Sequence, residues 1–535
     1  MLLFILPVLI QVSVFAQGYI KAADGPRIVS ETGSYWVVDG AFTLTSPSAA
    51  FPVTMANLKI NSGASLTIGP LDYLTVNGTL TNSAGNGGLV ISSDASGTGS
   101  LLNNTAEVSA LVKRYMNNAD WSVLNDGWHL LGSPVASQAI SPAFTTDPAA
   151  DYDFYCWDEP TNLWVNYQNM SGGGGTAPFF DVVNGSTNFT VGRGYLAAYK
   201  TEGTKVFSGT MNVANIDISG LTITGSTQPH RSWHLLGNPY ASALTWDATG
   251  NWNLVNISGV AKVWNEAIQD YSDITSTPSS AIPATNGFMV QVSSGTGSLT
   301  IPAAKRAHSS QPFYKSTFPS LILIARNTSA GNAKESSVYF NPDATPGFDL
   351  MYDGDFLAGY GPRFYSVAGS EHLSTNSLPD VGGTVQIPFD FIKNEGTNFT
   401  IEAESISGIT GPVILNDLKT GASQDLTLNP LYAFTAAPGD NPSRFLVTFS
   451  HVGMDGPKGE NTISIYTSGN MVYIQDKTGN SHGKVFVYNL TGQRLMQQEL
   501  AASGISQISL SAPTGYYIVK VVTDRDCSSS KVFIH

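Results

Sequence analysis

The chain has 535 residues, of which 42% are hydrophobic and only 12% carry a charged side chain. Ordinary soluble domains have about twice that charged fraction, ~25%. Long helices usually expose Lys, Glu and Arg, so this composition favours strands and turns and predicts an all-β fold. The net charge of −14, with no long basic run, disfavours nucleic-acid binding. Only two cysteines occur, Cys156 and Cys527, which excludes a disulfide framework and indicates two buried free thiols.

An apolar run opens the chain over residues 1–16, and the sequence turns polar at Gln17. The length and the small residues at its end are typical of a secretory signal peptide, although no Lys or Arg precedes the run. The run is shorter than the ~20 residues that a membrane-spanning helix needs, and no later segment is long enough either. We therefore expect export without a transmembrane anchor.

Residues 17–115 contain a short-period apolar pattern. Pairs of apolar residues two positions apart recur every eight residues, at Leu58/Ile60, Leu66/Ile68 and Leu74/Val76, with turn residues between them. Such pairs place both side chains on one face of a strand, and constant spacing is typical of stacked coils. We predict a short β-solenoid here, with the edge of a β-sandwich as the alternative.

An internal repeat follows. The segment WHLLGSPV at 128–135 matches WHLLGNPY at 233–240, and two later blocks, at 155–159 and 192–196, are echoed at 263–266 and 286–290. Three separated matches predict two copies of a β-rich unit, residues 116–225 and 226–310. Alternation within WHLLG predicts core tryptophans at 128 and 233, with histidines 129 and 234 at the surface or satisfied by partners.

Residues 311–451 again contain short apolar runs separated by turn-rich pieces, which predicts one β-sandwich. Residues 452–461 lack apolar periodicity and are predicted to be a linker. Residues 462–535 alternate apolar and polar positions in short runs bounded by turn signals such as Thr491-Gly492, which predicts a second, smaller sandwich.

The motifs of common catalytic classes are absent. The sequence has no His-Glu-x-x-His, no Gly-x-Ser-x-Gly, no phosphate-binding Gly-x-x-x-x-Gly-Lys-Ser/Thr and no Cys-x-x-Cys. Glycoside hydrolases need only two carboxylates at free sequence spacing, so a hydrolase stays open as the third hypothesis. No catalytic residue is assigned.

Two weaker patterns indicate binding. Trp164, Trp246 and Trp252 lie in polar, loop-like surroundings, where an exposed aromatic face could stack on a sugar ring; packing within the fold is the more ordinary role. Asp349, Asp353 and Asp355 form the densest acidic cluster and are weak candidates for calcium, although Asx turns account for them equally well.

The tail resembles the C-terminal sorting domain of cargo for the type IX secretion system of Bacteroidota. The resemblance rests on "VFVYNLTGQRL", on "GYYIVKV" and on a terminal Lys followed by apolar residues, and it includes Gly515, Tyr516, Lys531 and Val532. Cys527 is not part of that pattern. The arrangement of "GNPY", "NGFMVQV" and "GFDLMYDG" before the tail also resembles uncharacterised surface proteins of the same group.

The resemblance implies that the tail is a sorting signal for export. The tail would be recognised by the outer-membrane type IX machinery after Sec export, and the protein would be released or attached to surface lipopolysaccharide. The leading hypothesis is a secreted or cell-surface structural or adhesive protein without catalytic activity, and no cofactor. A carbohydrate-binding surface module that recognises extracellular glycans is the alternative, and extracellular proteins are the other possible partners.

Overall fold

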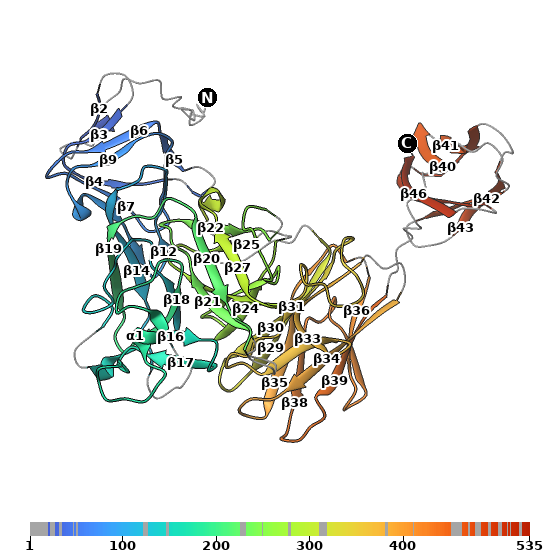
Figure 1. Ribbon diagram of the computed structural model, residues 1–535. Coiled ribbons are helices and arrows are strands. Elements are labelled where there is room, and N and C mark those ends of the chain that lie inside the picture. The colour runs from blue at the N-terminus through green and yellow to red at the C-terminus, as the bar shows by residue number, and fades with distance from the viewer. Residues whose placement is uncertain are drawn as a thin grey trace. The chain divides into compact units, whose positions relative to one another are not determined.

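The computed structural model divides into two compact units, Met1–Ser450 and His451–His535. It describes residues 20–21, 27–31, 35–46, 48–49, 52–120, 127–145, 149–224, 232–248, 250–276, 280–309, 318–379, 384–409, 411–450, 463–468, 471–476, 483–489, 494–500, 505–510, 512–513, 515–523 and 527–534. The predicted signal peptide and linker lie outside these ranges. Nearly all the regular secondary structure of the described residues is β-strand, which confirms the predicted all-β class (Figure 1).

A β-solenoid begins the first unit, as the eight-residue pattern predicts. Trp36 pairs in parallel with Leu58, and Leu58 with Leu80, so the coils of this face repeat every 22 residues. The three apolar pairs Leu58/Ile60, Leu66/Ile68 and Leu74/Val76 are three successive strands of one coil, and their side chains are buried. The strands are β1 (Ile20–Lys21), β2 (Arg27–Glu31), β3 (Tyr35–Val38), β4 (Ala41–Leu44), β5 (Val53–Met55), β6 (Asn57–Ile60), β7 (Ser65–Ile68), β8 (Tyr73–Val76), β9 (Leu80–Asn82), β10 (Leu89–Ile91), β11 (Ser93–Asp94), β12 (Gly97–Thr98), β13 (Ser100–Asn103) and β14 (Ser109–Met116), with the 3-10 turn η1 (Asn86–Gly88).

The solenoid continues into the first repeated unit without a break in its core. Strand β14 pairs in parallel with β10 on one side and antiparallel with β19 (Gly203–Thr210) on the other. One cluster of buried apolar residues accordingly runs from Val38 in the solenoid to Met211. The last solenoid strand therefore also serves the repeated unit.

The two repeated units contain sheets of the same topology. In the first the strand order is β15-β18-β16-β17, and in the second it is β21-β26-β23-β24, so corresponding strands occupy corresponding places. The elements are β15 (His129–Gly132), η2 (Ala149–Asp151), β16 (Tyr152–Asp158), β17 (Leu163–Asn166), α1 (Phe180–Asn184), β18 (Gly194–Tyr199), β20 (Ile216–Leu221), β21 (Trp233–Gly237), β22 (Ala243–Trp246), β23 (Ala261–Asn265), β24 (Asp270–Ile274), β25 (Ser280–Ile282), β26 (Gly287–Gln291), β27 (Gly297–Ile301), η3 (Ala303–Lys305) and β28 (Arg306–Ala307).

The two sheets meet through equivalent backbone contacts, which gives the pair a local pseudo-two-fold relation. Gly132 N donates to Thr285 O at 2.8 Å, and its counterpart Gly237 N donates to Gly192 O at 3.0 Å. A methyl group added to Gly132 would lie 2.6 Å from the Gly237 Cα, and one added to Gly237 would lie 2.7 Å from the Gly132 Cα. The contact is thus too close for any side chain, which explains the glycine in both copies of WHLLG.

The rest of the first unit is one eleven-stranded sheet that folds back on itself. Its strands are β29 (Ser320–Asn327), β30 (Ala333–Phe340), β31 (Gly354–Asp355), β32 (Arg363–Ala368), β33 (Glu371–Leu378), β34 (Thr384–Ile392), β35 (Asn398–Ser407), β36 (Val413–Asp417), β37 (Ala422–Asp425), β38 (Leu431–Thr435) and β39 (Ser443–Ser450). Strand β38 ends the sheet, yet Phe434 packs against Phe391 and Phe445 of distant strands, with ring centroids 4.9 and 5.0 Å apart. This closure makes the predicted sandwich.

The second unit consists of a three-stranded and a four-stranded sheet, in the orders β40-β41-β44 and β43-β42-β45-β46. Alternate residues such as Val519 and Val521 are buried between them, as the period-2 pattern predicts. The strands are β40 (Ile463–Ser468), β41 (Met471–Asp476), β42 (Gly483–Asn489), β43 (Arg494–Glu499), β44 (Ile505–Ser509), β45 (Gly515–Thr523) and β46 (Cys527–Ile534).

The glycine contact generates a stability prediction. Gly132→Ala and Gly237→Ala should each lower the free energy of unfolding of the first unit by about 1–3 kcal/mol, because an added methyl forces the two backbones apart. Denaturant unfolding followed by tryptophan fluorescence measures this. Gly172→Ala, where a methyl group would meet no atom within 4 Å, is the matched control. Two glycine variants as stable as this control would contradict the assigned contact.

Candidate functional site

A pair of tryptophans forms the exposed side of a pocket at the junction of the two repeated sheets. Trp157 on β16 and Trp164 on β17 are direct cross-strand partners, and their ring centroids lie 5.0 Å apart. Both side chains are partly exposed. Directly opposed aromatic residues on adjacent strands share one face of the sheet, so the hairpin itself creates the paired surface.

The second repeated sheet and a loop complete the pocket, which has a volume of about 200 Å³. Its lining residues are Trp157, Asn162, Trp164, Trp233, Tyr271, Met289, Leu357 and Ala358. Trp157 Nε1 donates a hydrogen bond to Trp233 O at 2.7 Å, which fixes the indole across the junction. Arg193 donates to Trp157 O at 2.8 Å and holds the same residue from its own sheet. We name this feature the junction pocket.

The lining of the junction pocket is uncharged at neutral pH. The described lining residues include no carboxylate, histidine, lysine, arginine or cysteine, and their one ionisable group is the phenol of Tyr271, whose pKa is raised by burial. The Asn162 amide can donate and accept hydrogen bonds at the rim. Trp233 is 1% exposed, and its Nε1 is a buried donor that has no partner among the described residues. Aromatic faces with a few polar groups suit a small, neutral, partly apolar ligand.

Two buried ion pairs lie behind this wall. Lys262, on β23, pairs with Asp273 on β24, and its Nζ lies 5.2 Å from the centre of the Trp233 ring. Lys334, on β30, pairs with Asp270 at 2.7 Å. All four charged side chains are at most 5% exposed. Charges removed from water are costly unless each is paired, so these pairs hold the adjoining strands in a fixed arrangement.

Lys334 also positions two walls of the junction pocket. Its Nζ donates to Tyr271 O at 3.1 Å and to Leu357 O at 2.9 Å, in addition to Asp270. Tyr271 belongs to the second repeated unit and Leu357 to the segment after it, so one ammonium group ties together residues from both. Nothing in the sequence pattern marks this lysine; only its burial, unusual for the residue type, reveals its role.

Each of the two repeat histidines has a partner within the protein, although the Nε2 atom of His129 is buried without one among the described residues. His129 is 2% exposed, and its Nδ1 lies 2.5 Å from Glu266 Oε1 of the other repeat. His234 Nε2 is 2.8 Å from Thr222 O, and the charge of Glu159, the counterpart of Glu266, acts on it. His129 thus contacts the glutamate of the other copy, whereas Glu159 accepts hydrogen bonds from Thr222 and Thr224. The sequence repeat shows both glutamates, but only the packing shows which groups they contact.

The prediction that Trp246 and Trp252 offer exposed platforms is wrong. Both are fully buried, and their ring centroids lie 4.6 Å apart beside Phe288 in the core of the second repeated unit. Trp246 Nε1 donates to Gly259 O and Trp252 Nε1 to Thr245 O, so their polar atoms are used internally. Polar neighbours in the sequence therefore did not indicate exposure. Of the three candidates, only Trp164 is partly exposed.

The three calcium candidates use their carboxylates on the protein's own hydrogen-bond donors. Asp353 is fully buried and accepts from Ser377 N at 2.6 Å and from Asp349 N at 2.7 Å. Asp349 accepts from Thr345 N at 2.5 Å, and Asp355 accepts from Gln291 Nε2 at 2.7 Å. Burial raises the pKa of Asp353 to about 7. These contacts are those of a structured turn, and the calcium hypothesis gains no support from them.

The four tail residues of the predicted sorting signal lie together at one end of a hairpin. Gly515 begins β45 and pairs with Ile534, Tyr516 pairs with Phe533, and Lys531 and Val532 stand opposite Ile518 and Tyr517. Val532 is 5% exposed and belongs to the core of this unit. Their adjacency follows from the antiparallel register. The sorting role itself stays a prediction.

The two cysteines lie in different units of the chain. Cys156 is a free, fully buried thiol whose pKa is raised by burial to about 11, so it is unreactive at neutral pH. Cys527 opens β46, and its side chain lies outside the described part of the structure.

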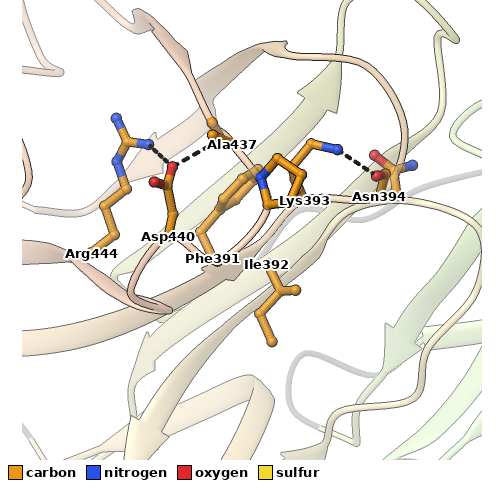
Figure 2. Close-up of a pocket in the computed structure, with 10 residues that line it drawn as sticks. Phe391, Ile392, Lys393, Asn394, Ala437, Asp440 and Arg444 are labelled. Atoms are coloured by element: carbon orange, nitrogen blue, oxygen red, sulfur yellow. Dashed lines mark hydrogen bonds and ion pairs between the residues drawn. The ribbon is translucent and has the colours of Figure 1, made fainter.

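A second pocket, of about 310 Å³, lies under the loop between β38 and β39 (Figure 2). Its charged groups already have partners: Lys393 Nζ donates to Asn394 O at 2.9 Å, and Asp440 accepts from Ala437 N at 2.9 Å and from Lys419 Nζ at 2.7 Å. Arg444, also in Figure 2, makes two hydrogen bonds to the buried carboxylate of Asp417. These contacts stabilise the loop, and we assign no ligand to it.

The family comparison covers most of the first unit. A family model described as a domain of unknown function, DUF8693, matches residues 37–278 and 267–449. The chain belongs to the DUF8693 family. The DUF8693 match includes every residue of the junction pocket and both buried ion pairs, and it stops before the second unit.

Other comparisons add no functional information. No curated protein matches this DUF8693 chain. A solved structure titled "Biofilm associated protein - BSP domain" aligns with 81% of this chain and 96% of its own, at 10% identity and a TM-score of 0.12. A likeness of that size supports no argument about fold or function. In the described part of the chain, no helix combines the length and the apolarity that crossing a bilayer requires.

The charges behind the junction pocket generate a pH prediction. Burial raises the pKa of Glu335 to about 7, and the negative charge of Asp273 adds to this effect. The folded state therefore binds this proton more tightly than the unfolded state. The contribution of Glu335 to the free energy of unfolding should rise as pH falls from about 7 towards about 4.5, where the unfolded carboxyl titrates.

Glu335→Gln should remove this dependence and raise the free energy of unfolding at pH 8 by about 1–3 kcal/mol. Denaturant unfolding of both proteins at pH 5 and pH 8 measures the difference. Asp353 titrates in the same range but is present in both proteins, so it cancels. The exposed Glu395 provides the control variant Glu395→Gln. Equal pH profiles for the wild type and Glu335→Gln would refute the assignment.

Proposed function

We propose that this chain is a secreted or cell-surface adhesive protein without catalytic activity, which binds carbohydrate at the junction pocket. The observation that carries the proposal is the Trp157–Trp164 pair, partly exposed and held across the repeat junction. Sugar rings present apolar C–H faces that pack on aromatic rings, and their hydroxyls need only a few polar partners. A neutral glycan fits a pocket whose lining carries no charge.

The hydrolase hypothesis finds no support in the pockets. Glycoside hydrolysis needs two carboxylates about 5–10 Å apart across the scissile bond. Four of the pockets formed by the described residues have lining residues with at most one carboxylate each, Asp440 in one and Asp417 in another. A purely structural surface role is the remaining alternative, and it would leave the junction pocket without a ligand.

Export through the type IX system is the second part of the proposal. It is supported by the resemblance of the tail, by the apolar N-terminal run and by the separate compact unit that the tail forms. A self-contained unit can be recognised by an export machine independently of the passenger before it. The mature protein would then be released or attached to surface lipopolysaccharide.

The carbohydrate hypothesis predicts binding on a glycan array that depends on the tryptophan pair. Trp157→Ala and Trp164→Ala should each weaken the affinity for the best ligand at least about tenfold, which equals ~1.4 kcal/mol, because each removes one stacking face. Titration calorimetry with that ligand measures the change.

Trp36→Ala, which removes a partly buried tryptophan of the solenoid, should bind as the wild type does. Thermal unfolding of each variant checks that the fold is kept. A silent array, or equal affinities for all four proteins, would contradict carbohydrate recognition and favour the purely structural role.

The export hypothesis predicts that deletion of residues 462–535 traps the protein in the periplasm. Cell fractionation with immunodetection of the first unit compares the deletion with the full chain in a host that has the type IX machinery. Because the first unit forms its own compact body, it should remain folded after the deletion. Unchanged delivery to the surface would refute the sorting role.

A further inference from the structure

The Lys262–Asp273 pair differs from an ordinary buried ion pair in its position and surroundings. The two residues are direct cross-strand partners on β23 and β24, so their side chains leave the sheet on the same face. Lys262 is fully buried and Asp273 is 5% exposed. Lys262 Nζ contacts Asp273 Oδ1 and donates to Ser374 Oγ at 2.8 Å. The reacting groups of an amine and a carboxyl are thus already in contact, without freedom to separate.

Hydrogen bonds to the other carboxylate oxygen make the Asp273 Cγ atom more electrophilic. Asp273 Oδ2 accepts hydrogen bonds from Ser374 Oγ and Thr375 Oγ1, both at 2.7 Å. Two fixed hydroxyl donors on one oxygen polarise the Cγ–Oδ2 bond and stabilise negative charge that develops there. Both donors come from β33, so the site is assembled only when the second repeated unit packs against the following sandwich.

The surroundings favour the uncharged form of the lysine. Burial lowers the pKa of Lys262 and so favours the uncharged amine, which is the nucleophile. Two charges withdrawn from water carry a large desolvation cost, whereas the neutral amide that would replace them does not. Trp233 covers one side of the lysine, which separates the pair from the junction pocket.

We propose that Lys262 and Asp273 condense spontaneously to an intramolecular isopeptide bond. The ammonium first gives a proton to Oδ1, and the resulting amine adds its lone pair to Cγ. The negative charge then formed on Oδ2 is held by the hydroxyls of Ser374 and Thr375. A second proton moves from nitrogen to Oδ1, the Cγ–Oδ1 bond breaks, and one water molecule leaves. The amide nitrogen keeps the third proton, so no other reactant is needed.

The neighbouring pair of Lys334 and Asp270 differs from this site because its groups are hydrogen-bonded as an ordinary ion pair. Lys334 Nζ has three oxygen acceptors, Asp270 Oδ1 and two backbone carbonyls, which satisfy an ammonium group completely. Burial raises the pKa of Asp270, and its hydrogen bonds from Lys334 and from the backbone amides of Tyr271 and Gly361 oppose that rise. We therefore assign condensation to Lys262 and a lasting ion pair to Lys334. A covalent bond at 262–273 would fix β23 to β24 behind Trp233 and resist unfolding under load.

Tryptic digestion of the denatured full chain tests the proposal. Trypsin cleaves after free lysine and arginine, so an unlinked chain yields the peptides 232–262 and 263–305. A lysine in amide linkage is not cleaved. The linked chain should instead yield one peptide, 232–305, lighter by one water molecule, with fragment ions that locate the bond between Lys262 and Asp273. Cleavage after Lys334 in the same digest shows that buried lysines became accessible.

Asp273→Ala removes the electrophile and should restore cleavage after Lys262 at full mass. The wild-type peptide decides the question even if this variant does not fold. Recovery of 232–262 and 263–305 at full mass from the wild type, with cleavage after Lys334 complete, would overturn the proposal. This result does not depend on whether the junction pocket binds a glycan.

Discussion

The close approach of Gly132 and Gly237 is the constraint on which the centre of the molecule depends. Without a side chain at either position, the two repeated sheets exchange equivalent backbone hydrogen bonds and come within contact distance. This places the outer hairpin of the first sheet beside strands β21 and β26 of the second. The junction pocket, the His129–Glu266 contact and the indole hydrogen bond of Trp157 all lie at this junction.

Two buried ion pairs and their hydrogen bonds connect the second repeated unit to the eleven-stranded sheet that follows it. In a chain with few charges, two lysines and two aspartates are withdrawn from water at one place, where they connect the second repeated unit to β30 and β33. Removing a charge from water destabilises the folded state unless the charge has fixed partners. Lys334 donates hydrogen bonds to the backbone carbonyls of Tyr271 and Leu357 and so fixes two walls of the junction pocket. Asp273 accepts hydrogen bonds from two hydroxyl groups of β33.

These arrangements support recognition more than catalysis. Ionisable groups lie behind the pocket wall, where they hold structure, while the lining itself is aromatic and neutral. The proposed adhesive role would gain from this division, because the shape of the pocket would not depend on the ionisation of its lining. The isopeptide proposal follows from the same buried charges and concerns mechanical resistance, which is useful for a protein that holds a surface under load.

Local sequence periodicity by itself determined the strands, because apolar residues two apart can all be buried only on one face of an extended chain. Periodicity predicted the solenoid strands at 58–76 and the tail sandwich, and the repeated WHLLG segments predicted the two equivalent units. Strands rich in polar residues, such as β33, were not visible in this way, since their burial depends on partners far along the chain. Trp246 and Trp252 show the same limit, because polar neighbours made buried residues look exposed. Tertiary packing alone decided that the Trp157 indole bonds to Trp233, that Lys262 meets Ser374, and that His129 meets Glu266, because these contacts join segments whose separation in sequence carries no periodic signal.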